Sequence, residues 1–85
     1  MLNYDAIIAR IKKVIEDHDL NAASFAEKIG VQRSGISHIL SGRNKPSLEF
    51  LSKIQATFKE VEYDWLLLGN PQVKSSKLNL FKLIL

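Results

Sequence analysis

Residues 33–41 carry the side chains best suited to hydrogen-bond chemistry. A helix turns by about 100° per residue, so one face of this stretch holds five polar residues: Arg33, Ser34, Ser37, His38 and Ser41. The opposite face is apolar, with Ile36, Ile39 and Leu40. Every side chain of the polar face can donate or accept a hydrogen bond, and none is acidic. A short helix with two such faces fits the major groove of duplex DNA, where base edges present donors and acceptors.

The polar face, taken alone, is more typical of a solvated surface helix. The charges around this stretch favour binding in the DNA groove over a solvated surface helix. Between residues 32 and 46 the chain has three cations and no acid, whereas most of its nine acids gather at 16–19 and 60–64. The net charge is only +3, but this uneven distribution predicts one positive end and one negative end.

Five helices are expected to position these residues. Apolar residues recur at helical spacing in five runs, separated by glycine, proline or capping residues. We predict helices over residues 4–18, 22–29, 33–41, 48–58 and 63–68. The expected N-caps include Asn21 and Ser47. No segment alternates in polarity over the length of a strand, so the predicted fold class is all-α, a compact five-helix bundle.

The last two helices are expected to cover the core. The apolar residues of the fourth helix that should face inward are Leu48, Leu51, Ile54 and Phe58. In the fifth helix, Tyr63 and Trp65 are expected to be core residues rather than a stacking platform for single-stranded nucleic acid.

The second and third helices form the sharpest pattern. Each is about eight residues long, and three residues, Gly30 to Gln32, join them. This connection is too short for antiparallel packing, so the two helices must cross steeply. Ala26 is small enough for a close approach of the backbones, and Gly30 can adopt the positive φ that the turn needs.

The composition argues against several other functions. A chain of 85 residues forms one domain, and without cysteine it has no disulfide or thiolate site. The two histidines have no carboxylate at ligand spacing, and no serine has a partnered base. We therefore expect no metal, no cofactor and no enzyme activity. No run suits a membrane span or a secretory signal, which predicts a cytoplasmic protein.

Four stretches of the chain resemble a known family. They are residues 20–31 (LNAASFAEKIGV), 36–42 (ISHILSG), 45–48 (KPSL) and 63–69 (YDWLLLG). Together they are similar to the XRE family, the helix-turn-helix regulators related to the lambdoid phage repressors and Cro. The resemblance covers about residues 4–70. It implies a lambda-repressor-like DNA-binding fold in which residues 33–41 form the recognition helix.

The resemblance also implies which residues meet DNA. The expected base-contacting residues are Arg33, Ser34, Ser37 and His38. The expected contacts to the sugar–phosphate backbone come from Ala22, Gln32, Ser41, Arg43, Asn44 and Lys45. At Ala22 the main-chain amides of the helix start would make the contact. Arg33 is the strongest candidate reader, because a guanidinium can bond O6 and N7 of guanine together.

Three positions depart from the pattern of the family. Ala22 stands where glutamine is frequent, and Gln32 stands at the cap of the recognition helix, where Ser or Thr is usual. Glutamine caps poorly. Gly35 lies inside the same helix and costs about 1 kcal/mol relative to alanine. We therefore expect a recognition helix of low intrinsic stability, which DNA can help to order.

The end of the chain bears on how copies associate. We expect a DNA-binding domain over 1–70, a polar linker over 71–77 and an extension over 78–85, in which six of eight residues are apolar. The extension could cover its own core, pair with a second chain or begin a further region, and we favour pairing. The expected function is a sequence-specific transcriptional regulator that binds duplex DNA as a homodimer on a palindromic operator. The alternative is an antitoxin-like protein that binds a toxin and regulates its own operon.

Overall fold

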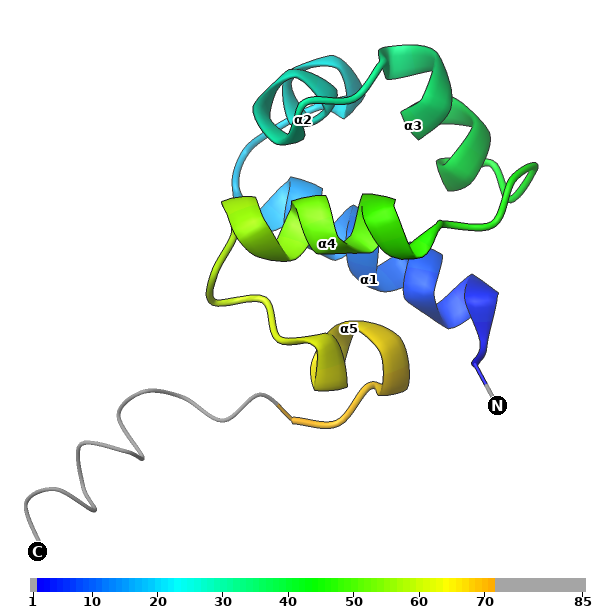
Figure 1. Cartoon of the computed structure of the whole chain (residues 1–85), viewed down its shortest axis with the longest axis vertical. Coiled ribbons are helices and arrows are strands. Elements are labelled where there is room, and N and C mark those ends of the chain that lie inside the picture. Colours follow the sequence, from blue (N-terminus) through cyan, green and yellow to red (C-terminus); the bar gives the residue numbers. More distant parts are fainter. Residues whose placement is uncertain (1, 72–85) are drawn as a thin grey trace, which may run out of the picture.

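The computed structural model describes residues 2–71, and these form five α-helices (Figure 1). The helices are α1 (Tyr4–Asp17), α2 (Ala22–Ile29), α3 (Arg33–Leu40), α4 (Leu48–Thr57) and α5 (Tyr63–Leu68). The predicted all-α class is therefore confirmed. The predicted extension over 78–85 lies outside the described residues, as does the linker from 72 onward. Within the described range, no helix has the length and apolar character needed to cross a membrane.

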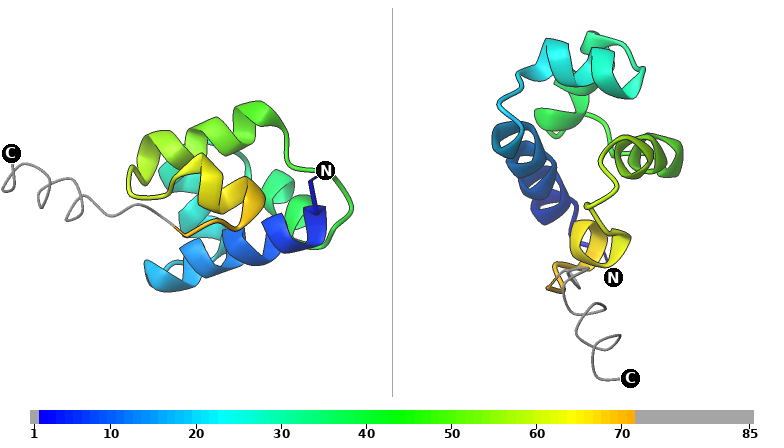
Figure 2. Two further views of the ribbon diagram at one scale, coloured as in Figure 1. Left: turned by 90° about the horizontal axis from the view of Figure 1, so that it is seen from below. Right: turned by 90° about the vertical axis from the view of Figure 1, so that its left-hand side faces the viewer.

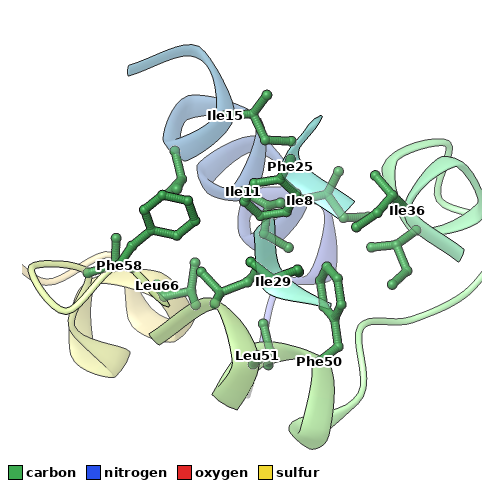
Figure 3. Close-up of a cluster of buried hydrophobic side chains, with 14 of the residues drawn as sticks. Ile8, Ile11, Ile15, Phe25, Ile29, Ile36, Phe50, Leu51, Phe58 and Leu66 are labelled. Carbon is green, nitrogen blue, oxygen red and sulfur yellow. The ribbon is translucent and has the colours of Figure 1, made fainter. Parts of the chain in front are cut away.

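One hydrophobic core joins all five helices (Figure 3). α1 packs against α3 and α5, and α2 packs against α3 and α4. The largest fully buried side chains come from every helix: Ile7, Ile11, Phe25, Ile36, Ile54 and Leu66. Complete burial of each such side chain contributes about 1.5–3 kcal/mol, so these short helices are stabilised mainly by packing.

The helix ends agree with the sequence pattern to within one residue. α1, α3 and α4 each end one residue before the predicted position, because His18, Ser41 and Phe58 are their C-caps. Both predicted N-caps are confirmed. The side-chain oxygen of Asn21 accepts a hydrogen bond from the Ser24 amide at 2.8 Å, and Oγ of Ser47 accepts one from a backbone amide of α4.

Two expectations about the core are wrong. Leu48 is 76% exposed and Tyr63 is 40% exposed, although both were expected to be buried. Each is the first residue of its helix. Because helical side chains tilt toward the helix N-terminus, the first residue of a helix can project past the helix end and away from the core, as Leu48 and Tyr63 do. In α4, Phe50 takes the buried position instead, together with Leu51.

Three contacts between distant residues hold α5 and the connection before it in place. Nη1 of Arg10 donates a hydrogen bond to the Leu66 carbonyl at 3.0 Å, which joins α1 to α5. Nε2 of His18 lies 2.8 Å from Oε1 of Glu60, and the His18 ring packs on Phe58 with centroids 4.4 Å apart. These contacts place the connection between α4 and α5 beside the end of α1.

Candidate nucleic-acid interface

The turn between α2 and α3 sets the angle of the two helices. Gly30 ends α2 in the left-handed region, with φ 79° and ψ 38°. The amides of Gly30 and Val31 both donate to the Ala26 carbonyl at 2.9 Å, so the chain reverses tightly at this point. Ala26 is only 2% exposed. The helices cross steeply, and α3 lies at the periphery of the molecule (Figures 1 and 2). The predicted helix-turn-helix is confirmed.

The polar face of α3 is largely open to solvent. Arg33, Ser34 and Ser37 are exposed and His38 is half-buried, whereas Ile36 and Ile39 are buried on the opposite face. The four residues predicted to contact bases therefore lie on the non-core side of one short helix. No acidic side chain within residues 2–71 forms an ion pair with Arg33. The Arg33 guanidinium is thus available to an external acceptor.

The start of α3 is weakly held, as expected from its sequence. The Gln32 side chain makes no capping hydrogen bond to the first turn, so within the described structure the cap lacks its usual side-chain acceptor. Gly35 lies in the middle of the helix, and open space surrounds the position that a Cβ would take. Gly35 therefore serves no close packing contact within residues 2–71. It leaves α3 with the entropic cost of a glycine.

The loop that follows α3 folds back on the carbonyl oxygen of His38. This oxygen accepts hydrogen bonds from the amides of Arg43 (2.9 Å) and Asn44 (3.1 Å) and from Oγ of Ser41 (3.1 Å). Arg43 and Asn44 remain exposed. The hydroxyl proton of Ser41 already serves this internal bond, so the predicted phosphate contact of Ser41 would require that bond to break.

Lys45, at the far end of the loop, lies over an aromatic ring. Its Nζ atom is 5.0 Å from the centroid of the Tyr4 ring, a cation–π geometry. Tyr4 is the first residue of α1. The sequence predicts a DNA contact for Lys45 but gives no signal for its contact with Tyr4, because no local pattern connects two residues so far apart in the chain.

The start of α2, the first helix of the helix-turn-helix, presents main-chain amides. The side-chain oxygen of Asn21 already accepts a hydrogen bond from the Ser24 amide. In return, Oγ of Ser24 accepts a hydrogen bond from the Asn21 amide at 2.9 Å. The predicted phosphate contact therefore falls to the amides of Ala22 and Ala23, which precede Ser24. The first amides of a helix have no partner within the helix and carry its positive dipole end.

Comparisons with known proteins agree with this geometry. A model of the helix-turn-helix family matches residues 11–66 of the chain. A solved structure, that of a transcriptional regulator from Listeria innocua, is similar with a TM-score of 0.63 at 23% identity, over 99% of this chain and 78% of the other. No curated protein matches significantly. The structural likeness supports the fold, and the family match covers more than half of the chain. The chain belongs to the helix-turn-helix family and carries a DNA-binding domain of the XRE type.

Proposed function

We propose that the protein is a transcriptional regulator that reads a specific duplex DNA sequence through α3. The observation that carries the proposal is the exposed, acid-free face formed by Arg33, Ser34 and Ser37, with His38 beside it. An arginine at the start of a helix in the major groove can bond guanine with both arms of its guanidinium. Repression or activation would follow from occupancy of the site, because no chemical step is required.

Backbone contacts would fix the register of α3 in the groove. We assign them to Gln32, Arg43, Asn44 and Lys45, with the amides near Ala22 and a secondary contact from Ser41. These groups flank α3 on both sides in sequence, and amides and cations are the groups that bind phosphate without reading sequence. The domain that does this spans residues 1–70.

A homodimer on a palindromic operator is the expected binding unit. A single short helix contacts only a few base pairs, so useful specificity requires two helices placed one DNA turn apart, about 34 Å. We assign the pairing of copies to the apolar residues 78–85, which follow the linker 71–77. A two-fold symmetric protein selects a two-fold symmetric site.

The decisive experiment is selection of binding sites from random duplex DNA at two salt concentrations. The full chain is expected to enrich a two-fold symmetric sequence, and a chain that lacks residues 72–85 is expected to lose the symmetry. Arg33→Ala should lower discrimination at one base pair of each half-site by about 5- to 150-fold, the equivalent of 1–3 kcal/mol. Selection without any enriched sequence would refute the proposal.

Lys45→Gln is the matched control for Arg33→Ala. It removes a cation of the same interface that we assign to phosphate rather than to a base. It should weaken binding to all sequences about equally and leave their ranking unchanged. If Arg33→Ala also left the ranking unchanged, Arg33 would not be a base-reading residue.

A further inference from the structure

We propose that Tyr4 is a positioning residue for DNA binding, because its ring holds the Lys45 ammonium where that cation can contact a phosphate. The inference rests on the proposed function and deepens it. It adds a residue from the start of α1 to an interface otherwise built from α2, α3 and the loop after α3. Tyr4 itself need not touch DNA.

The position of the Tyr4 ring is well fixed. Tyr4 begins α1, and the side-chain oxygen of Asn3 caps this helix by accepting the Ala6 amide at 3.0 Å. The ring is half-buried and packs against the hydrophobic core. Because the Tyr4 backbone is fixed in α1 and one side of the ring packs on the core, the free face of the ring has a fixed position relative to Lys45.

Lys45 meets this ring from a loop that is itself anchored on both sides. Before Lys45, the amides of Arg43 and Asn44 donate to the His38 carbonyl, and after it Pro46 is buried. Lys45 is exposed, with Nζ 5.0 Å from the ring centroid. The loop thus brings the lysine stem to Tyr4, and the ring determines where the ammonium comes to rest.

The ring and a phosphate can hold the same ammonium together. An aromatic face attracts a cation within about 6 Å through its quadrupole. The ammonium has three N–H donors, so those directed away from the ring remain available to a phosphate oxygen. A free lysine loses rotamer freedom when it binds. On Tyr4 much of that freedom is already lost before DNA arrives, and binding is correspondingly tighter.

A double-mutant cycle tests this role. Tyr4→Leu in the otherwise native chain should weaken binding to an operator duplex and to a random duplex alike, by about two- to fivefold. Its salt dependence should match the native one, because Lys45 still neutralises a phosphate in the complex. Lys45→Gln should instead lower the salt slope by about 1 per subunit. In the Lys45→Gln background, Tyr4→Leu should have no further effect on affinity.

Two controls separate positioning from packing. Tyr4→Phe keeps the aromatic face and should bind like the native chain. In the DNA-free native protein, the NMR signals of the Lys45 ε-methylene protons should shift upfield because of the ring current of Tyr4. This readout needs no variant, so it tests the contact even if Tyr4→Leu fails to fold.

Three results would overturn the inference. Equal losses from Tyr4→Leu in both backgrounds would show that Tyr4 acts only through packing. Tighter binding by Tyr4→Leu would show that the ring withholds Lys45 from DNA. Unshifted Lys45 methylene signals would show that the contact does not form. A native chain that binds no duplex would refute the proposed function as well, so the two failures are distinguishable.

Discussion

Both ring nitrogens of His18 face oxygen acceptors. Nδ1 lies 2.7 Å from the Val14 carbonyl oxygen, and Nε2 lies 2.8 Å from Oε1 of Glu60. A neutral imidazole has one N–H and can donate to only one of them, whereas the imidazolium donates to both. The Val14 carbonyl is the largest cause that raises the pKa of His18 above its ordinary value of 6.5. Burial opposes the rise, and the carboxylates of Glu60 and Asp17 add to it.

This arrangement predicts a pH dependence of stability. A group whose pKa is higher in the folded chain than in the unfolded chain stabilises the fold when it is protonated. The contribution of His18 is complete below pH 6.5 and is lost as the pH rises through the elevated pKa. Between pH 6 and pH 9 the melting temperature should therefore fall more in the native protein than in His18→Gln, whose amide does not titrate.

Glu60→Gln is the matched control for this effect. It removes the carboxylate but keeps the Val14 carbonyl, so part of the pH dependence should remain. Thermal melts followed by circular dichroism across the pH range give the melting temperatures of all three proteins. Superimposable pH profiles for the native chain and His18→Gln would contradict the assignment.

At the scale of elements, local sequence signals such as capping residues and turn glycines predict the five helices well. Asn21 and Gly30 bracket α2 because a capping side chain and a positive φ are local requirements. The direction of side chains at helix starts was not anticipated, which is why Leu48 and Tyr63 were misplaced.

The candidate site was predictable to the same extent. The rotation of one helix suffices to separate Arg33, Ser34 and Ser37 from the buried Ile36. The contact of Lys45 with Tyr4 was not predictable, because it depends on how α1 packs beneath the loop. Contacts between distant residues follow from the tertiary arrangement and leave no periodic trace in the sequence.

The end of α5 illustrates how such a contact constrains a residue. Gly69 ends α5 with φ 78°, and a Cβ at this position would lie 2.5 Å from Nη2 of Arg10. An alanine would force the Arg10 guanidinium, the end of a flexible side chain, to move, and this movement would weaken or break its hydrogen bond to the Leu66 carbonyl. Gly30 offers a matched comparison: it ends α2 with φ 79°, and within the described structure no heavy atom beyond its own sequence neighbours lies within 4 Å of its Cβ position.

We therefore predict that Gly69→Ala destabilises the protein more than Gly30→Ala. Both variants bear the cost of about 1–2 kcal/mol for a left-handed alanine. Gly69→Ala should lose up to about 1 kcal/mol more, because the displaced Arg10 guanidinium weakens or loses its charged hydrogen bond. Urea denaturation measures the difference in the free energy of unfolding. In an Arg10→Met background the two penalties should become equal, and a difference that persists there would exclude Arg10 as its cause.

At the scale of the whole molecule, α1 connects the basic loop, which is residues 41–47 with Arg43 and Lys45, to the acid-rich segments 16–19 and 60–64. Its first residue, Tyr4, lies under Lys45, and its last residue, Asp17, precedes the contact between His18 and Glu60. That contact brings the acids of 16–19 close to Glu60, at the start of the acid-rich segment 60–64. A helix of 14 residues is about 20 Å long. The basic loop and the connection between α4 and α5 accordingly lie at opposite sides in Figure 1.

This distance predicts that the acids influence DNA binding only at low salt. Electrostatic interactions are screened over about 8 Å at 0.15 M salt and about 30 Å at 0.01 M. Over 20 Å of water an acid and a phosphate repel each other by about 0.2 kcal/mol before screening, and a bound duplex presents several phosphates. Removal of two acids should thus raise affinity a few-fold at 0.01 M and leave it nearly unchanged at 0.15 M.

The suitable variant combines Glu16→Gln with Asp19→Asn. Both residues are exposed, and asparagine tolerates the φ of 55° at position 19. Lys45→Gln is the comparison, because a residue in contact with phosphate lowers affinity at both salt concentrations. Titrations of a duplex with each protein at 0.01 M and 0.15 M salt measure the effects. If the acid variant raised affinity equally at both, the acids would lie near the bound DNA, and the duplex would not be confined to the face formed by α3 and the basic loop.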